Sequence, residues 1–130
     1  MITTLAQVAL LVRDYDEAIA FYGDKLGFRL LEDTDRGHGR RWVVMQTPGG
    51  GGSRVLISKS ADSEQGATVG KQAGGRVLFF LHTDNFKADY EAMTAKGVKF
   101  VDGPREEVYG TVGVFLDLYG NRMDLIQPKG

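Results

Sequence analysis

The chain has 130 residues, 42% of them hydrophobic, which is enough for one domain with a continuous core. It has 16 Lys and Arg against 17 Asp and Glu, so it lacks the basic surplus that drives binding to nucleic acids or anionic membranes. It contains no cysteine, which excludes disulfides, thiolate metal ligands and a cysteine nucleophile. The apolar run 8–12 is too short to span a membrane and no cleavage-site pattern follows it, so we expect a cytoplasmic protein.

The first half of the chain predicts a βαβββ unit. Residues 5–12 are rich in aliphatic side chains and predict a buried strand. Asp14 is suited to cap a helix over residues 15–26, with Glu17 three residues on, and Gly27 is placed to end it. Three further strands are predicted at 28–33, 41–47 and 54–60, separated by a polar turn or loop at 33–40 and a glycine-rich turn at 48–53.

The second half predicts the same order of elements after a linker. Residues 61–73 are small or polar apart from Val69, and we interpret them as the linker between module 1–60 and module 74–130. A strand is predicted at 77–83, and Asp84 is expected to cap a helix over residues 85–96 that ends at Gly97. The last three strands are predicted at 98–103, 111–117 and 122–128.

An internal repeat connects the two halves. At an offset of about 70 residues, Asp14 falls on Asp84, Ala18 on Ala88 and Gly27 on Gly97. Any two αβ units can share a capping aspartate and a terminal glycine, but here the same number of strands also follows each helix. The sequence therefore predicts a single α+β domain over residues 1–130 that is built from two tandem βαβββ modules.

Two stretches carry a family resemblance. The segment 8–33 combines a strand, an Asp-capped helix with an aromatic pair, and a Leu-Gly-Phe exit. The segment 108–128 contains two strands joined by an Asp-x-x-Gly-Asn turn. Together these modules resemble the vicinal oxygen chelate superfamily, which includes glyoxalase I, bleomycin-resistance proteins and extradiol dioxygenases. The resemblance implies a curled, cup-shaped mixed sheet with the helices outside, and a metal site on the first and last strands of each module.

The resemblance places the four metal-ligand positions at Gln7, Leu56, Val77 and Asp124. Glutamine and aspartate can coordinate a metal, but the two aliphatic side chains cannot, and catalytic metal sites usually have about three protein ligands. We therefore expect no metal cofactor, with Gln7 and Asp124 as the candidates if a divalent ion does bind. Otherwise these two side chains should hydrogen-bond each other or water inside one cavity. Gln7 or Arg122 is the partner expected for Asp124.

Other polar groups favour structural roles. His38 lies among glycines in the 33–40 turn and His82 ends a strand, and neither matches a ligand position of the family. The run Gly49–Gly52 is not followed by a helix, so it predicts a flexible turn and not a phosphate loop. Arg36, Arg40 and Arg41 are accompanied by three nearby acids, at positions 32, 33 and 35, which favours a solvated face over an anion site.

The alternation of strand residues predicts an apolar binding cavity. By the parity of Gln7 and Asp124, Leu11, Phe79 and Leu81 are expected to face the concave side of the sheet. The predicted ligand-binding residues are Gln7, Leu11, Trp42, Leu56, Val77, Phe79, Tyr109, Phe115 and Asp124.

These residues predict a homodimeric small-molecule-binding protein that holds a hydrophobic or aromatic ligand. The alternative is a metal-dependent lyase, isomerase or dioxygenase of the glyoxalase I type, whose catalytic residues the sequence does not identify. A regulatory or partner-binding domain without a ligand is a third hypothesis. No nucleic acid and no membrane is expected as a partner.

Overall fold

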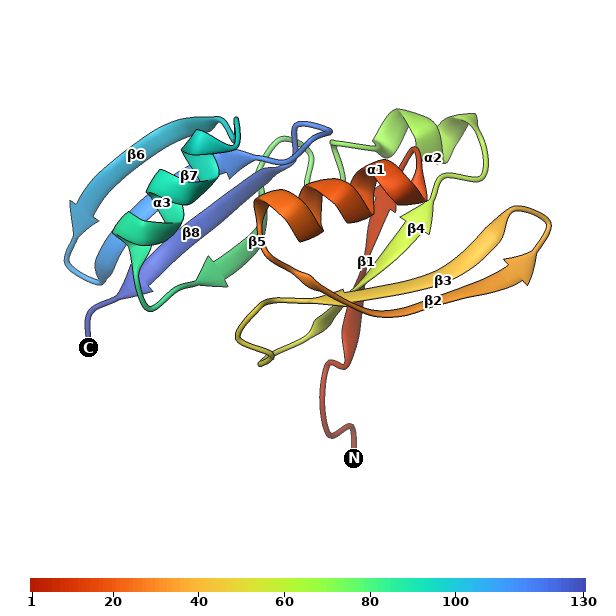
Figure 1. Cartoon of the computed structure of the whole chain (residues 1–130), viewed down its shortest axis with the longest axis horizontal. Helices are drawn as coiled ribbons and strands as arrows, with labels where there is room; N and C mark the ends of the chain where they lie inside the picture. Colours follow the sequence, from red (N-terminus) through yellow and green to blue (C-terminus); the bar gives the residue numbers. More distant parts are fainter. The chain divides into compact units, whose positions relative to one another are not determined.

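Two units, Met1–Val69 and Gly70–Gly130, make up the computed structural model, which describes all residues from 1 to 130 (Figure 1). The first unit contains β1 (Gln7–Val12), α1 (Tyr15–Ala20), the π-helical η1 (Phe21–Lys25), β2 (Arg29–Gly37), β3 (Arg40–Gln46), β4 (Arg54–Lys59) and α2 (Ser63–Thr68). The second contains β5 (Val77–His82), α3 (Phe86–Ala95), β6 (Phe100–Glu107), β7 (Gly110–Leu116) and β8 (Arg122–Pro128).

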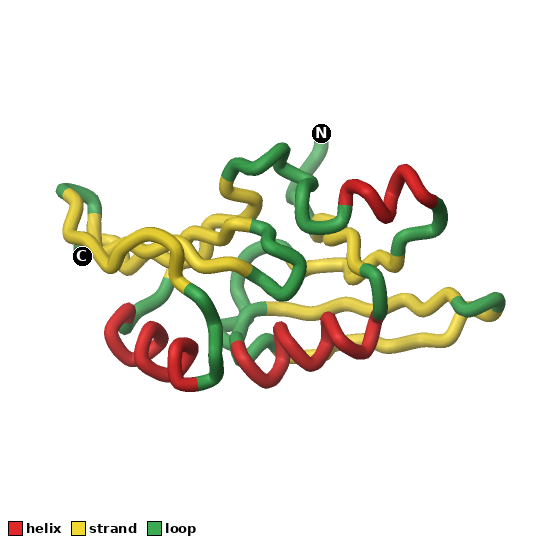
Figure 2. The backbone as a smooth tube through the Cα atoms, turned by 90° about the horizontal axis from the view of Figure 1, so that it is seen from above, coloured by secondary structure: helices red, strands yellow, loops and turns green.

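Each unit contains one open, mixed sheet of four strands. The strand orders are β1-β4-β3-β2 and β5-β8-β7-β6, so the two units have the same topology. The first and last strands of each unit pair in parallel, and the other neighbours are antiparallel. The long helix of each unit runs alongside its strands, as Figure 2 shows. The predicted α+β fold with two βαβββ modules is confirmed.

In the first unit, alternate strand residues pack beneath α1. Leu10 of β1 and Ile57 of β4 are aligned and almost wholly buried, and Val43 of β3 pairs with Ile57. Tyr22 contributes a buried ring that packs edge-on against Phe28, 5.3 Å between centroids. Burial of each such side chain stabilises the fold by about 1.5–3 kcal/mol. Because side chains alternate along a strand, the intervening residues are left for the other face of the sheet.

In the second unit, aromatic rings fill the space beneath α3. Phe100 of β6 packs against Phe86 and Tyr90 of the helix and against Phe115 of β7. Gly113 makes room for this cluster, because a Cβ there would lie 3.0 Å from the Phe86 ring and 3.1 Å from the Phe100 ring. The face of α3 that carries Phe86, Tyr90 and Met93 is therefore the one that packs on the sheet.

The two units differ by one residue at two places. A register shift between Val77 and Phe79 inserts a residue into β5, so eight residues separate Val77 from the α3 cap, against seven between Gln7 and Asp14. The cap is therefore Asn85, whose side chain accepts from the Ala88 N–H, and the prediction of Asp84 was wrong. In the first unit the π-helical turn η1 contains one extra residue. The offset between the units, which the insertion in β5 raises to 71 at the caps Asp14 and Asn85, therefore returns to 70 at Gly27 and Gly97.

Two predicted loops are more ordered than expected. The segment predicted as a linker, 61–73, contains α2, which is capped by Asp62, and Val69 after it is buried. Gln65 reciprocates, because its backbone N–H donates to Asp62 and its side chain accepts from the Ala61 N–H. The polar stretch 33–40 is largely strand, since β2 continues to Gly37 by pairing with β3 and only the tip of the hairpin is a turn.

The Asp-x-x-Gly-Asn motif forms the predicted turn between β7 and β8. The buried Asp117 carboxylate accepts from the backbone N–H groups of Tyr119 and Asn121 and from the Asn121 side chain. The Asp117 backbone N–H also donates to the Asn121 carbonyl, and the Asp117 carbonyl accepts from the Gly120 N–H. All four hydrogen-bonding atoms of Asp117 thus stabilise the turn. None of the helices in the structure combines the length and the apolarity that a membrane crossing requires.

Candidate functional site

One face of the first sheet carries four of the nine residues predicted to bind a ligand. Gln7, Ala9 and Leu11 of β1 alternate with the buried residues that face α1, so they lie on the opposite face of the sheet. Leu56 of β4 is aligned with Ala9 and is therefore on this same face. Trp42 of β3 lies two residues before Val44, which pairs with Leu56, and so it belongs there too.

A cavity of about 210 Å³ opens between β3 and β4 at the end of their ladder. The last pair of the ladder is Val43 with Ile57, and the β2–β3 hairpin then extends away from β4 (Figure 1). Past this pair, the Arg40 guanidinium donates to the Lys59 carbonyl at 3.2 Å. The cavity is lined by Tyr15, Arg36, Arg40, Arg41, Trp42, Leu56, Ile57, Ser58 and Lys59. It includes two residues predicted for ligand binding, Trp42 and Leu56.

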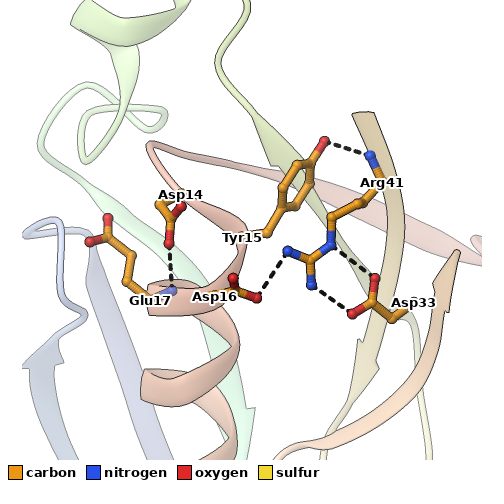
Figure 3. Close-up of polar contacts among 6 residues, drawn as sticks. All are labelled: Asp14, Tyr15, Asp16, Glu17, Asp33 and Arg41. Atoms are coloured by element: carbon orange, nitrogen blue, oxygen red, sulfur yellow. Dashed lines mark hydrogen bonds and ion pairs between the residues drawn. The ribbon is translucent and has the colours of Figure 1, made fainter. Parts of the chain in front are cut away.

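Arg41 fixes one side of this cavity by joining α1 to the β2–β3 hairpin (Figure 3). Its guanidinium forms a bidentate pair with Asp33 at 3.0 and 2.7 Å and a salt bridge with Asp16 at 2.9 Å. It also lies 5.1 Å from the centre of the Tyr15 ring, while its backbone N–H donates to the Tyr15 hydroxyl. Hydrogen bonding to Arg41 lowers the pKa of Asp33, and its two carboxylate partners raise the pKa of Arg41.

In the second sheet, strand register decides which predicted residues share a face with Asp124. Phe80 of β5 is aligned with Asp124, whereas Phe79 is aligned with the buried Met123 beneath α3. The orientation predicted for Phe79 and Leu81 was therefore wrong, because the extra residue in β5 reverses the alternation. Val77 lies before this shift and is aligned with Arg122, so it is on the Asp124 face.

Two predicted aromatic residues lie elsewhere in the second unit. Phe115 is 0% exposed and pairs with Met123, so it is a core residue and not part of a ligand-facing wall. Tyr109 is 54% exposed in the turn before β7. The histidines match no ligand position either, because His38 lies at the tip of the β2–β3 hairpin and His82 is exposed at the end of β5.

Asp124 lies in a partly desolvated position on β8. Burial raises its pKa, the nearby Arg105 opposes this effect, and Asp102 adds to it. Arg105 is itself paired with Asp102 and with Glu107, at 2.9 Å for the latter. The cation that acts on Asp124 is thus Arg105 of β6 and not Arg122, one of its two predicted partners, which lies on its own strand.

The donor set does not fit a bound metal ion. Leu56 and Asp124 occupy corresponding places in the two units. Leu56 lies two residues after Arg54, which is aligned with Gln7. Asp124 lies two residues after Arg122, which is aligned with Val77. The four family positions therefore comprise one amide, one carboxylate and two aliphatic side chains. No three His, Cys, Asp or Glu side chains lie close enough together to hold a metal ion. We derive no metal-dependent step from these residues.

A known family model covers almost the whole chain. The model of the Glyoxalase/Bleomycin resistance protein/Dioxygenase superfamily matches residues 4–125. The chain belongs to this superfamily. The resemblance found in the sequence is therefore confirmed.

Relatives and solved structures of the superfamily are similar over almost the whole chain. An uncharacterised protein from Shewanella frigidimarina (strain NCIMB 400) is 50% identical, covering 95% of this chain and 93% of its own. The crystal structure of UcmS2 is 32% identical with a TM-score of 0.84, over 97% of this chain and 98% of its own. TnmS3, an antibiotic binding protein from Streptomyces sp. CB03234, is 26% identical with a TM-score of 0.79, over 98% of both chains.

Several residues of the cavity were not predicted as ligand-binding residues. The sequence assigns Tyr15 to the first helix and Ser58 and Lys59 to the fourth strand, and it predicts a solvated surface at Arg36 and Arg40. The signal for Ser58 and Lys59 was their position just after the aliphatic residues of a strand. Such a signal identifies a strand end, but it does not show where a neighbouring strand stops pairing.

Proposed function

We propose that this protein binds a small hydrophobic or aromatic molecule, without a metal ion, in the cavity between β3 and β4 and on the adjoining sheet face. The observation that carries the proposal is this cavity, which has Trp42, Leu56 and Ile57 in its lining. It is supported by the aliphatic Leu56 and Val77 at family metal positions, and by the likeness to an antibiotic binding protein.

The cavity has the chemistry of a ligand site. An indole ring and two aliphatic side chains offer a surface for a flat apolar group, and aromatic pairs gain about 0.5–1.5 kcal/mol beyond simple burial. Ser58 and Tyr15 add hydroxyl groups that can fix an orientation. Its 210 Å³ is smaller than most drug-sized sites, so we expect it to take one ring system, with the rest of a larger ligand on the sheet face.

A thermal-shift screen of planar aromatic compounds tests the proposal. A bound compound should raise the melting temperature, and the rise should grow with the logarithm of its concentration above the dissociation constant. The variant Leu56→Ala should lose most of this shift, because it removes part of the wall. Leu31→Ala is the matched control, since Leu31 is an exposed leucine of β2 outside the cavity and its loss should leave the shift unchanged. If no compound in the panel stabilises the protein, the binding function is wrong.

A metal-dependent lyase, isomerase or dioxygenase is the alternative function. It is favoured by the oxygen-bearing side chains of Gln7 and Asp124 at family ligand positions. Elemental analysis of protein purified without chelator separates the two. One equivalent of nickel, zinc, manganese or iron per chain would support the enzyme and contradict the metal-free binding site.

A further inference from the structure

The cavity between β3 and β4 holds an unusual concentration of positive charge. Four of its nine lining residues are cationic and none is acidic: Arg36, Arg40, Arg41 and Lys59. These charges accompany the apolar surface of Trp42 and Leu56. A neutral apolar ligand would contact the apolar residues but would leave the cationic groups without a partner.

Three of these four cations have no carboxylate partner. Arg41 is satisfied by Asp33 and Asp16, whereas Arg36, Arg40 and Lys59 take part in no salt bridge of the structure. The acids expected to balance them are engaged elsewhere. The Glu32 carboxylate accepts from the Thr34 hydroxyl, and the Asp35 carboxylate accepts from the Gly37 N–H. Arg36 and Arg40 are exposed, as predicted for a solvated face, but the nearby acids do not pair with them, so both remain accessible to an anionic group.

The two unpaired guanidinium groups are held at the cavity by other contacts. Arg36 lies 5.5 Å from the centre of the Trp42 ring, a distance suited to a cation–π interaction. Arg40 is anchored by its bond to the Lys59 carbonyl at the end of β4. An arginine has five N–H donors, so both retain donors in a planar fork that matches a carboxylate or sulfonate.

We propose that the cavity selects planar aromatic molecules that carry an anionic group. The ring lies against Trp42 and Leu56, and the carboxylate or sulfonate is bound by Arg36 and Arg40. Because the cavity is the one assigned above to ligand binding, this specificity rests on the proposed function. Lys59 adds positive charge at the same site and strengthens the preference for anions.

The fluorescence of Trp42 tests the charge of the cavity directly, because it is the only tryptophan in the chain. Iodide and caesium quench tryptophan emission by collision and carry opposite charges. We expect iodide to quench Trp42 about threefold or more better than caesium relative to free N-acetyltryptophanamide, with the excess falling as salt screens the site. Equal relative quenching by the two ions would overturn the proposal without any variant being needed.

Titration with matched ligands tests the recognition itself. We expect 4-nitrobenzoate to quench Trp42 saturably with an affinity about tenfold higher than its neutral analogue 4-nitrobenzyl alcohol, after correction for absorbed light. Equal binding of both would overturn the anion preference and leave small-molecule binding intact. Failure of both to bind would also overturn it, while the thermal-shift screen tests the broader function separately.

Charge-removing variants identify the residues responsible. Arg36→Gln and Arg40→Gln should each weaken 4-nitrobenzoate binding about threefold to tenfold and leave 4-nitrobenzyl alcohol binding unchanged. The control is Arg29→Gln, which removes the same charge from the same strand about 23 Å from Arg36. An equal loss in the control variant would mean that net charge, and not the cavity, attracts the anion, and this result would overturn the proposal.

Discussion

At the scale of single residues, Arg41 determines how α1 is held to the β2–β3 hairpin. Its guanidinium binds Asp33 and Asp16 and lies over the Tyr15 ring. Its backbone N–H donates to the Tyr15 hydroxyl. These contacts join two segments that are far apart in the sequence (Figure 3). They also leave Arg41 without free charge for a ligand, which separates its structural role from that of Arg36 and Arg40.

The Asp33–Arg41 pair should make stability depend on pH in the acid range. The pKa of Asp33 lies below its ordinary value of 3.8, so the stabilisation is present above pH 3.8 and is lost as the pH falls through the folded-state pKa. We expect Asp33→Asn to lower the free energy of unfolding by about 1 kcal/mol at pH 7 and by less near pH 3. Urea unfolding at both pH values measures this.

The matched control for that prediction is Asp84→Asn. Asp84 is an exposed carboxylate that forms no salt bridge in the structure. Its replacement should change stability by a few tenths of a kcal/mol at most. A similar loss in both variants would show that the Asp33–Arg41 contact contributes nothing specific.

Asp124 should respond to its neighbours with opposite signs. Arg105 lowers its pKa and Asp102 raises it, while burial accounts for the largest part of the upward shift. We expect Arg105→Gln to raise the pKa of Asp124 further and Asp102→Asn to lower it. Carbon-detected NMR titration of the carboxyl group measures both changes. Shifts of the same sign in the two variants would contradict this arrangement of charges.

At the scale of elements, close backbone packing at Gly70 holds the start of the second unit against its own β7–β8 turn. Gly70 has a φ of +81°, and a Cβ there would lie 2.1 Å from the Tyr119 carbonyl oxygen. We expect Gly70→Ala to lower the free energy of unfolding by about 3 kcal/mol, because both the backbone strain and the carbonyl contact oppose it. Denaturant unfolding measures the loss.

Gly74→Ala separates these two causes. Gly74 also has a positive φ, +65°, but a Cβ there would meet nothing within 4 Å. Only the conformational cost remains, so we expect a loss of about 1 kcal/mol. If the two variants were equally destabilised, the close approach to the Tyr119 carbonyl would contribute nothing to the loss of stability in Gly70→Ala.

The elements of this fold are largely predictable from the sequence, but insertions of one residue are not. Caps, apolar periodicity and glycine stops located both long helices and all the strands. The extra residues in β5 and η1 leave composition and spacing almost unchanged, and each reveals itself only through a hydrogen-bond register. That is why the cap at Asp84 and the orientation of Phe79 were predicted wrongly while Gly97 was correct.

The candidate site was predictable only in part, for a related reason. Alternation from Gln7 predicted the side of β1 on which Leu11 lies, whereas Leu56 was chosen from the family's ligand positions. The two share a face because pairing keeps aligned residues on one side. The cavity beside them exists because β3 and β4 stop pairing at Val43 and Ile57. The end of a ladder depends on the twist and length of two strands, and no single segment of sequence encodes it.

At the scale of the whole molecule, exposed apolar surface and open sheet edges favour self-association. Phe80 is 64% exposed, and every residue of the edge strand β2 is exposed. We expect a homodimer, for which light scattering should give about 28 kDa, or twice the 14.2 kDa of one chain. A mass near that of one chain at micromolar concentration would contradict the prediction.

Metal content tests whether the four family positions still belong to one site. Gln7 and Asp124 carry oxygen donors, and Leu56 and Val77 carry none. If the prediction that they share one cavity holds, the double variant Leu56→Glu, Val77→His would supply four donors to one ion.

We expect that double variant to bind about one equivalent of zinc or nickel by calorimetry, and the parent to bind none tightly. The control pair is Leu31→Glu in β2 with Leu118→His in the β7–β8 turn. It adds the same side chains away from the family positions and should bind no metal. A parent that binds one metal per chain would support the enzyme instead. A double variant that folds but binds none would show that these positions do not converge.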